Sequence, residues 1–129
     1  MKRNNNFVTI IGKRFYFQQK DLFSEMGRVK AAVQHIEVST GKEHFTASSP
    51  KVKELNEFDI VLMRKDPPFN MEYIYTTYLL EQAEDQGAFV VNNPRSLRDA
   101  NEKLFTLWFP EDCPKTLVSA DKDTIKAFW

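Results

Sequence analysis

A short apolar run followed by charges and prolines constrains this chain more than any other stretch. Residues 58–63 are mainly aliphatic and do not alternate with polar residues, which predicts a strand buried on both faces. The charged triplet Arg64, Lys65 and Asp66 follows at once, and two prolines then hold the backbone extended. A helical pattern begins at Asn70. A strand followed directly by a helix predicts a βα unit of a parallel sheet, and such sheets bind ligands beyond the carboxyl ends of their strands.

The charged triplet has two interpretations. It is either a solvated turn with a chance pairing of arginine and aspartate, or a corner that holds a ligand. Arg64 favours the second, because its planar guanidinium can grip a carboxylate through two parallel hydrogen bonds. On spacing alone, the solvated turn is the simpler interpretation.

Size and charge exclude several classes of protein. The chain has 129 residues, the size of one domain, with 18 basic and 18 acidic residues. A neutral formal charge argues against a dedicated nucleic-acid binder, including one acting through Lys2 and Arg3. The single cysteine, Cys113, indicates a reducing compartment. No apolar stretch approaches the roughly 20 residues that span a bilayer. We therefore expect a cytoplasmic protein without nucleic-acid or membrane partners.

The first half of the chain is rich in strand-like patterns. Residues 7–11 and 14–18 predict a hairpin around a glycine–lysine turn. Residues 21–24 predict a short turn of helix. Residues 28–38 alternate loosely and, with residues 44–47, predict an antiparallel hairpin arm.

The second half alternates helices and short strands. Asn70 is a suitable N-cap and Gly87 a suitable end for a helix. The apolar face of that helix is predicted to comprise Met71, Ile74, Tyr75, Tyr78 and Leu79. Residues 88–91 predict a buried strand.

A second helix is predicted after Pro94, with an inward stripe of Leu97, Ala100, Leu104 and Trp108. Residues 116–118 predict a third short strand, and Asp121 caps a last helix. The closing apolar residues of that helix are Ile125, Phe128 and Trp129. They either fold back onto the sheet or indicate a chain cut short, and both interpretations stay open.

Few residues suggest catalytic chemistry. The four glycines are scattered, so neither common phosphate-binding loop is present. His35 and His44 lack neighbours at metal-ligand spacing, and Cys113 has no nearby histidine that would activate it. The tyrosines after Asn70 favour packing over a stacking platform. Lys103 follows Asp99 by four residues, which predicts a surface salt bridge worth about 0.3–0.5 kcal/mol.

Four segments together resemble bacterial glutathione synthetase: residues 59–69, 73–83, 91–105 and 126–129. The resemblance is dense from about residue 55 onward and weaker before it. Members of this family join γ-glutamylcysteine to glycine with ATP and magnesium, as ATP-grasp ligases. The resemblance covers the front of such an enzyme, the Rossmann-like region that precedes the ATP-grasp fold.

The resemblance also implies roles for individual residues. Arg64 would contact a γ-glutamylcysteine-like peptide, with Lys65 and Asp66 shaping that pocket. Lys103 would contact ATP. The implied cofactors of the complete enzyme are ATP and magnesium, and this chain alone is expected to hold neither. It implies no catalytic or metal-ligating residue here, and it leaves homo-oligomer formation open.

The departures from the family pattern set the expected organisation. We expect an open α/β, Rossmann-like sheet with flanking helices and an antiparallel hairpin arm, truncated at both ends relative to the family. Residues 1–13 form an atypical N-terminal segment, residues 14–118 the substrate-side domain, and residues 119–129 the start of a connection to an ATP-grasp domain. The missing first βα unit is expected to leave apolar surface uncovered. Alone, the chain is expected to be inactive; the alternative is a non-catalytic interaction or regulatory module.

Overall fold

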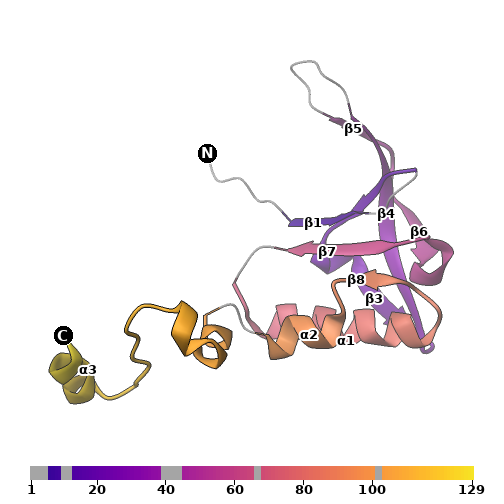
Figure 1. Ribbon diagram of the computed structural model, residues 1–129. Coiled ribbons are helices and arrows are strands. Elements are labelled where there is room, and N and C mark those ends of the chain that lie inside the picture. The colour runs from indigo at the N-terminus through magenta and orange to yellow at the C-terminus, as the bar shows by residue number, and fades with distance from the viewer. Residues whose placement is uncertain (1–5, 10–12, 39–44, 66–67, 101–102) are drawn as a thin grey trace. The chain divides into compact units, whose positions relative to one another are not determined.

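The structure, a computed structural model, describes residues 6–9, 13–38, 45–65, 68–100 and 103–129 (Figure 1). It divides into two units, Met1–Asp99 and Ala100–Trp129. The first unit contains the sheet and two helices, and the second contains short helical segments joined by loops.

The sheet of the first unit is mixed. Its strands are β1 (Asn6–Thr9), β2 (Phe15–Phe17), β3 (Leu22–Glu25), β4 (Arg28–Val38), β5 (Phe45–Ala47), β6 (Lys51–Glu54), β7 (Val61–Lys65) and β8 (Val90–Val91). The path runs β3-β4-β2-β1-β7-β8, and β5 and β6 also pair with β4. Only β7 and β8 pair in parallel among the described strands. The expected open α/β sheet is confirmed, while parallel pairing is limited to that one βα crossover.

Strand β4 organises the sheet because it pairs along both edges. Lys30 lies opposite Phe23 of β3 and also opposite Glu54 of β6, so those strands flank it on opposite sides. Further along β4, strand β2 pairs with the same edge of β4 as β3, and strand β5 pairs with the same edge as β6. The predicted arm is confirmed in β4 and β5, and the turn between them, with His44, lies outside the described residues.

The start of the chain agrees only partly with its pattern. The predicted first hairpin is confirmed, since Val8 lies opposite Phe17 in the antiparallel pair β1–β2. The predicted helical turn over residues 21–24 is wrong. A 3₁₀ turn, η1 (Gln19–Asp21), precedes it, and Leu22 then pairs with Ala31 as a strand residue. Strand β6 and the 3₁₀ turn η2 (Leu55–Glu57) lie in a stretch for which the pattern predicted no element.

Helix α1 (Met71–Asp85) is capped as predicted. The Asn70 side chain accepts a hydrogen bond from the Tyr73 amide at 3.0 Å. Gly87 follows the helix with φ +96°, a conformation that favours glycine. The buried face, however, differs from the predicted one: Leu80 is fully buried, while Tyr75 is 58% exposed.

Two threonines explain the difference in buried face. Thr76 donates its hydroxyl hydrogen to the Glu72 carbonyl at 2.9 Å, and Thr77 donates to the Ile74 carbonyl at 2.7 Å. Satisfied in this way, both residues are buried. A pattern that counts only apolar residues therefore places Met71, Tyr75 and Tyr78 wrongly in the core, although Leu79 of the predicted face does pack against it.

Helix α2 (Pro94–Asp99) begins where predicted but ends early. Leu97 packs against the core. The rest of the predicted stripe is wrong, because the helix stops at Asp99 and Trp108 is exposed in a separate 3₁₀ segment.

The second unit contains η3 (Phe105–Trp108), η4 (Pro110–Asp112) and α3 (Lys122–Phe128). The predicted cap of α3 is confirmed by the Thr124 amide, which donates to the Asp121 carboxylate at 2.7 Å. The predicted strand over residues 116–118 is wrong, since this stretch is a loop.

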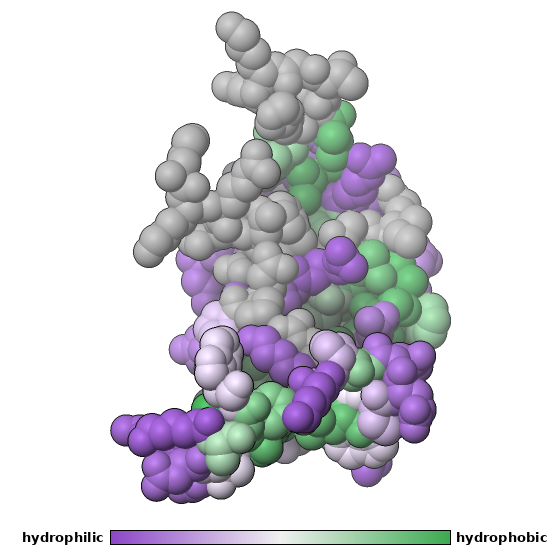
Figure 2. Space-filling model, turned by 60° about the vertical axis from the view of Figure 1, so that its left-hand side comes forward, coloured by the Kyte–Doolittle hydropathy of each residue, from purple (hydrophilic) through white to green (hydrophobic). Residues whose placement is uncertain are grey.

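Apolar side chains reach the surface in both units, and Figure 2 shows hydrophobic residues interspersed with hydrophilic ones on the face it presents. In the first unit they include Val38 and Val52 on the sheet and Tyr78 on α1. The link between this surface and a missing βα unit stays a prediction.

The side chain of Gln86 ties the end of α1 to the β3–β4 hairpin. Its Oε1 accepts from the Val29 amide at 3.0 Å, and its Nε2 donates to the Gly27 carbonyl at 2.7 Å. We expect Gln86→Ala to lower the free energy of unfolding by about 1–3 kcal/mol, because the amide of buried Val29 loses its partner. Urea denaturation followed by circular dichroism measures the change. Gln82→Ala, on the same helix, is the control, and equal losses in the two variants would contradict the role of Gln86.

Candidate functional site

The corner that follows the buried run begins inside the sheet. Arg64 and Lys65 belong to β7, where they lie opposite Phe7 and Asn6 of β1. The expectation that they stand beyond the strand is therefore wrong for these two residues. Their backbone is fixed by the β1–β7 pairing instead of by a loop. Asp66 lies outside the described residues.

Alternation along β7 decides which way Arg64 faces. Val61 and Met63 are buried in the core, so Arg64 lies on the other face of the strand. The Arg64 side chain is exposed, and none of the described residues hydrogen-bonds to it or forms an ion pair with it. Lys65 is half-buried. The prediction of a strand buried on both faces holds for one face, since Leu62 is only half-buried.

The segment after the prolines is anchored to the first turn of α1. The Asn70 amide donates to the Pro68 carbonyl at 3.1 Å. The rings of Phe69 and Tyr73 pack with centroids 5.1 Å apart. Residues 68–70, which follow the charged triplet, are thus held against the first turn of α1.

Lys103, the other predicted site residue, belongs to the second unit. It lies in a turn before η3 instead of on a helix, and its carbonyl accepts from the Thr106 hydroxyl at 2.6 Å. Its predicted partner, Asp99, forms an ion pair with Arg95 at 3.5 Å. The role of Lys103 toward a nucleotide stays a prediction.

The remaining candidates have structural contacts. The half-buried His35 ring packs edge-on against Phe15, with centroids 5.5 Å apart. The Cys113 sulfur lies 3.5 Å from the Thr106 carbonyl oxygen. No group of three His, Cys, Asp or Glu side chains that could hold a metal ion occurs among the described residues. The described residues do not by themselves fit a magnesium–nucleotide site. No described helix is long and apolar enough to cross a membrane.

A cluster around Arg98 was not predicted. Its guanidinium donates to Glu81 at 2.5 Å and to the Thr77 hydroxyl at 3.2 Å, and it covers the Tyr78 ring at 4.3 Å. These contacts lock α2 onto α1. The available signal was the pair of Tyr78 and Glu81, three residues apart on one helix and therefore on one face.

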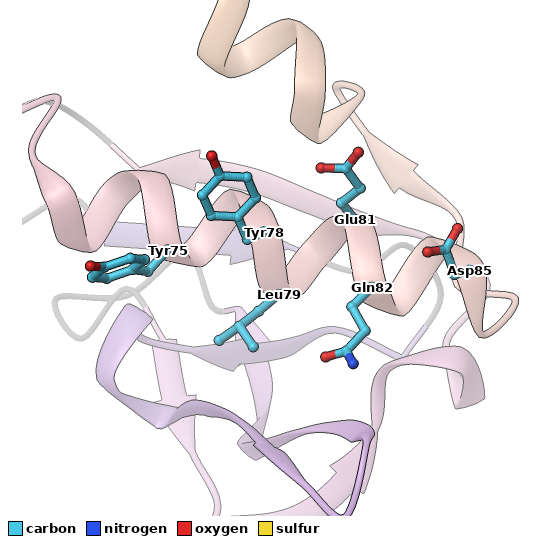
Figure 3. Close-up of a pocket in the computed structure, with 6 residues that line it drawn as sticks. All are labelled: Tyr75, Tyr78, Leu79, Glu81, Gln82 and Asp85. Atoms are coloured by element: carbon cyan, nitrogen blue, oxygen red, sulfur yellow. The ribbon is translucent and has the colours of Figure 1, made fainter.

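The outer surface of α1 carries a shallow, open concavity of about 540 Å³. Its lining comes entirely from α1: Tyr75, Tyr78, Leu79, Glu81, Gln82 and Asp85. Figure 3 shows Tyr78 and Glu81 pointing to one side of the helix and Leu79 and Gln82 to the other. The aromatic residues occupy the first half of the row and the carboxylates the second.

A family profile supplies the deciding comparison. The profile described as prokaryotic glutathione synthetase, N-terminal domain, matches residues 12–98. The chain belongs to this family. The glutathione synthetase family domain thus spans the strands from β2 to β8, with both Arg64 and α1 inside it.

Individual relatives agree with the family assignment. The glutathione synthetase of Coxiella burnetii is 49% identical over 88% of this chain, and that of Vibrio vulnificus strain YJ016 is 53% identical over 88%. The Shewanella oneidensis enzyme is 43% identical over 99% of the chain. The aligned region covers 36% of the length of the first two relatives and 43% of the third. The chain therefore spans less than half of the length of each of these relatives.

Proposed function

We propose that this chain is the substrate-side portion of a glutathione synthetase and binds the γ-glutamyl dipeptide through Arg64. The observation that carries the proposal is an exposed guanidinium without a side-chain partner among the described residues, on a residue whose backbone is paired in a strand of the family domain. An exposed guanidinium without a partner among the described residues suits a carboxylate ligand, because its planar fork can donate two parallel hydrogen bonds to the two carboxylate oxygens. By the alternation along β7, Lys65 lies on the opposite face from Arg64, so we propose that Asp66, rather than Lys65, shapes this pocket.

We also propose that the chain does not ligate γ-glutamylcysteine to glycine when it is alone. The chain spans 36% of the length of its Coxiella relative, so it supplies only part of what such a ligase contains. In a longer enzyme Lys103 would contact ATP. The chemistry that ATP and magnesium supply in the family is activation of the dipeptide carboxylate.

The binding proposal is tested by calorimetric titration of the whole chain with γ-glutamylcysteine. We expect Arg64→Ala to weaken binding about 10- to 100-fold, since a charge-assisted pair contributes about 1.5–3 kcal/mol. Arg64→Lys keeps the positive charge but loses the planar guanidinium, so its affinity is expected to lie between those of the unmodified and Arg64→Ala chains. Arg95→Ala, which removes another exposed arginine, is the control and should bind like the unmodified chain. Equal affinity of the unmodified and Arg64→Ala chains would contradict the assignment.

A separate assay tests the proposal that the chain alone does not form glutathione. The chain is mixed with ATP, magnesium, γ-glutamylcysteine and glycine, and glutathione is measured directly. Measurable ligation by this chain alone would contradict that half of the proposal without touching the binding half.

A second candidate function is a non-catalytic interaction module built on the same domain. The observation that favours it is the exposed aromatic and acidic row of α1, which the dipeptide proposal does not use.

A further inference from the structure

The outward side of α1 has the spacing of a helix that packs against another helix. Met71, Tyr75, Tyr78, Gln82 and Asp85 follow one another at intervals of four, three, four and three residues. Alternating steps of this kind form the seam of a helix pair. Met71 is 55% exposed, Tyr75 58% and Tyr78 53%. Within the described part of the first unit, the Arg98 guanidinium lies over the Tyr78 ring at 4.3 Å, and Met71 and Tyr75 remain more than half exposed.

The seam is polarised along the helix. Its first half is apolar and aromatic, whereas Asp85 is exposed in its last turn, close to Glu81 and Glu84. Burial, followed by the charges of Glu81 and Asp85, raises the pKa of Glu84, as expected where carboxylates crowd. The last turn contains no basic residue, and the C-terminal end of a helix already carries partial negative charge.

The nearby cation Arg98 neutralises Glu81 but leaves Asp85 unpaired among the described residues. Arg98 is engaged by Glu81, with the side chain of Arg98 only 15% exposed. Asp85 forms no ion pair with any described residue. Asp85, exposed at the negative end of the helix dipole, would therefore be stabilised by a cation from outside the chain.

This polarity argues against a second copy of the chain as the occupant. Two antiparallel seams would place Met71 of one copy against Asp85 of the other. Two parallel seams would place Asp85 against Asp85, which is repulsive. In neither arrangement does the seam itself provide a basic residue.

We propose that the α1 seam docks an amphipathic helix of a partner protein that carries lysine or arginine at one end. Apolar residues of that helix pack on Met71, on Tyr75 and on the exposed part of Tyr78, and its basic end pairs with Asp85. The surface is independent of the proposed dipeptide site, because Arg64 lies on the face of β7 away from the core that α1 packs against. The two proposals can therefore fail separately.

The test uses two fluorescein-labelled synthetic helical peptides of about five turns, roughly 18 residues. Both carry the same leucine row, one ends in arginines and the other in glutamates. Fluorescence anisotropy with the whole chain should show the arginine peptide binding at least tenfold more tightly, with the difference shrinking at high salt. Tyr75→Ala should weaken binding of the arginine peptide about tenfold. Asp85→Lys should reverse the preference between the two peptides.

Val52→Ala is the matched control, because Val52 is 60% exposed on β6. It should leave the affinity for both peptides unchanged, and thermal melts should show that every variant stays folded. Equal binding of both peptides, no binding of either, or an equal effect of Val52→Ala and Tyr75→Ala would overturn the proposal. A dimer in sedimentation that Tyr75→Ala dissociates would also overturn it, since the occupant would then be a second copy.

Discussion

Leu80→Ala is expected to lower the free energy of unfolding by about 2–5 kcal/mol. Leu80 is fully buried and belongs to the core cluster with Val61 and Val90 of the two parallel strands. Truncating it removes buried apolar surface and leaves a cavity where α1 meets the sheet. Urea denaturation monitored by circular dichroism gives the free-energy difference.

Tyr75→Ala is the matched control for Leu80→Ala. Tyr75 lies on the same helix but is 58% exposed, so its replacement should change stability by no more than about 0.5 kcal/mol. The pair of variants distinguishes the observed helix face from the one that the sequence pattern predicts. A larger loss for Tyr75→Ala than for Leu80→Ala would show that the pattern was right and the observed face wrong.

Arg98→Leu is expected to cost about 1.5–3 kcal/mol of unfolding free energy. The substitution removes the ion pair to Glu81, the hydrogen bond to Thr77 and the contact with the Tyr78 ring. Glu81 is 38% exposed, so solvent screens the pair and the loss stays below that of a fully buried ion pair. Thermal and urea unfolding both measure it.

Arg95→Ala is the control for Arg98→Leu. Arg95 and Asp99 form an ion pair on the same short helix, but the two side chains are 74% and 67% exposed. Such a pair contributes about 0–0.5 kcal/mol. Equal losses in the two arginine variants would contradict the idea that Arg98 locks α2 onto α1.

The elements that depend on residues close together in the sequence were predicted correctly. Strand β4 has the predicted bounds, and the caps at Asn70 and Asp121 form the predicted hydrogen bonds. Each depends on residues adjacent in sequence: alternation in a strand, or a side chain that reaches the amide three residues later. The glycine after α1 falls in the same class.

The errors arise where contacts distant in sequence override the local pattern. Leu22 forms a strand because Ala31 lies opposite it, which no window around residue 22 reveals. The buried face of α1 includes two threonines whose hydroxyl groups donate hydrogen bonds to backbone carbonyls of the preceding turn. The buried strand was expected in a parallel sheet, but β7 has a parallel neighbour only in β8, because β1 pairs with its other edge in the antiparallel direction.

The candidate site was predictable in part. The sequence located the corner at Arg64 and Lys65, and the structure shows a guanidinium exposed on a strand that β1 pairs with. The roles of these residues and of Lys103 stay predictions that ligand binding must test. The α1 seam was missed because Met71, Tyr75 and Tyr78 were assigned to the core, so their exposure became visible only with the fold.

Strand β4 also sets an order of events during folding. Its partners β2, β3, β5 and β6 all lie nearby in sequence, so these pairings close short loops and can form early. The pairing of β1 with β7 joins Val8 to Met63 and closes a much longer loop. We infer that β7, the strand that carries Arg64, pairs with β1 late in folding, after the strands around β4 have paired with one another.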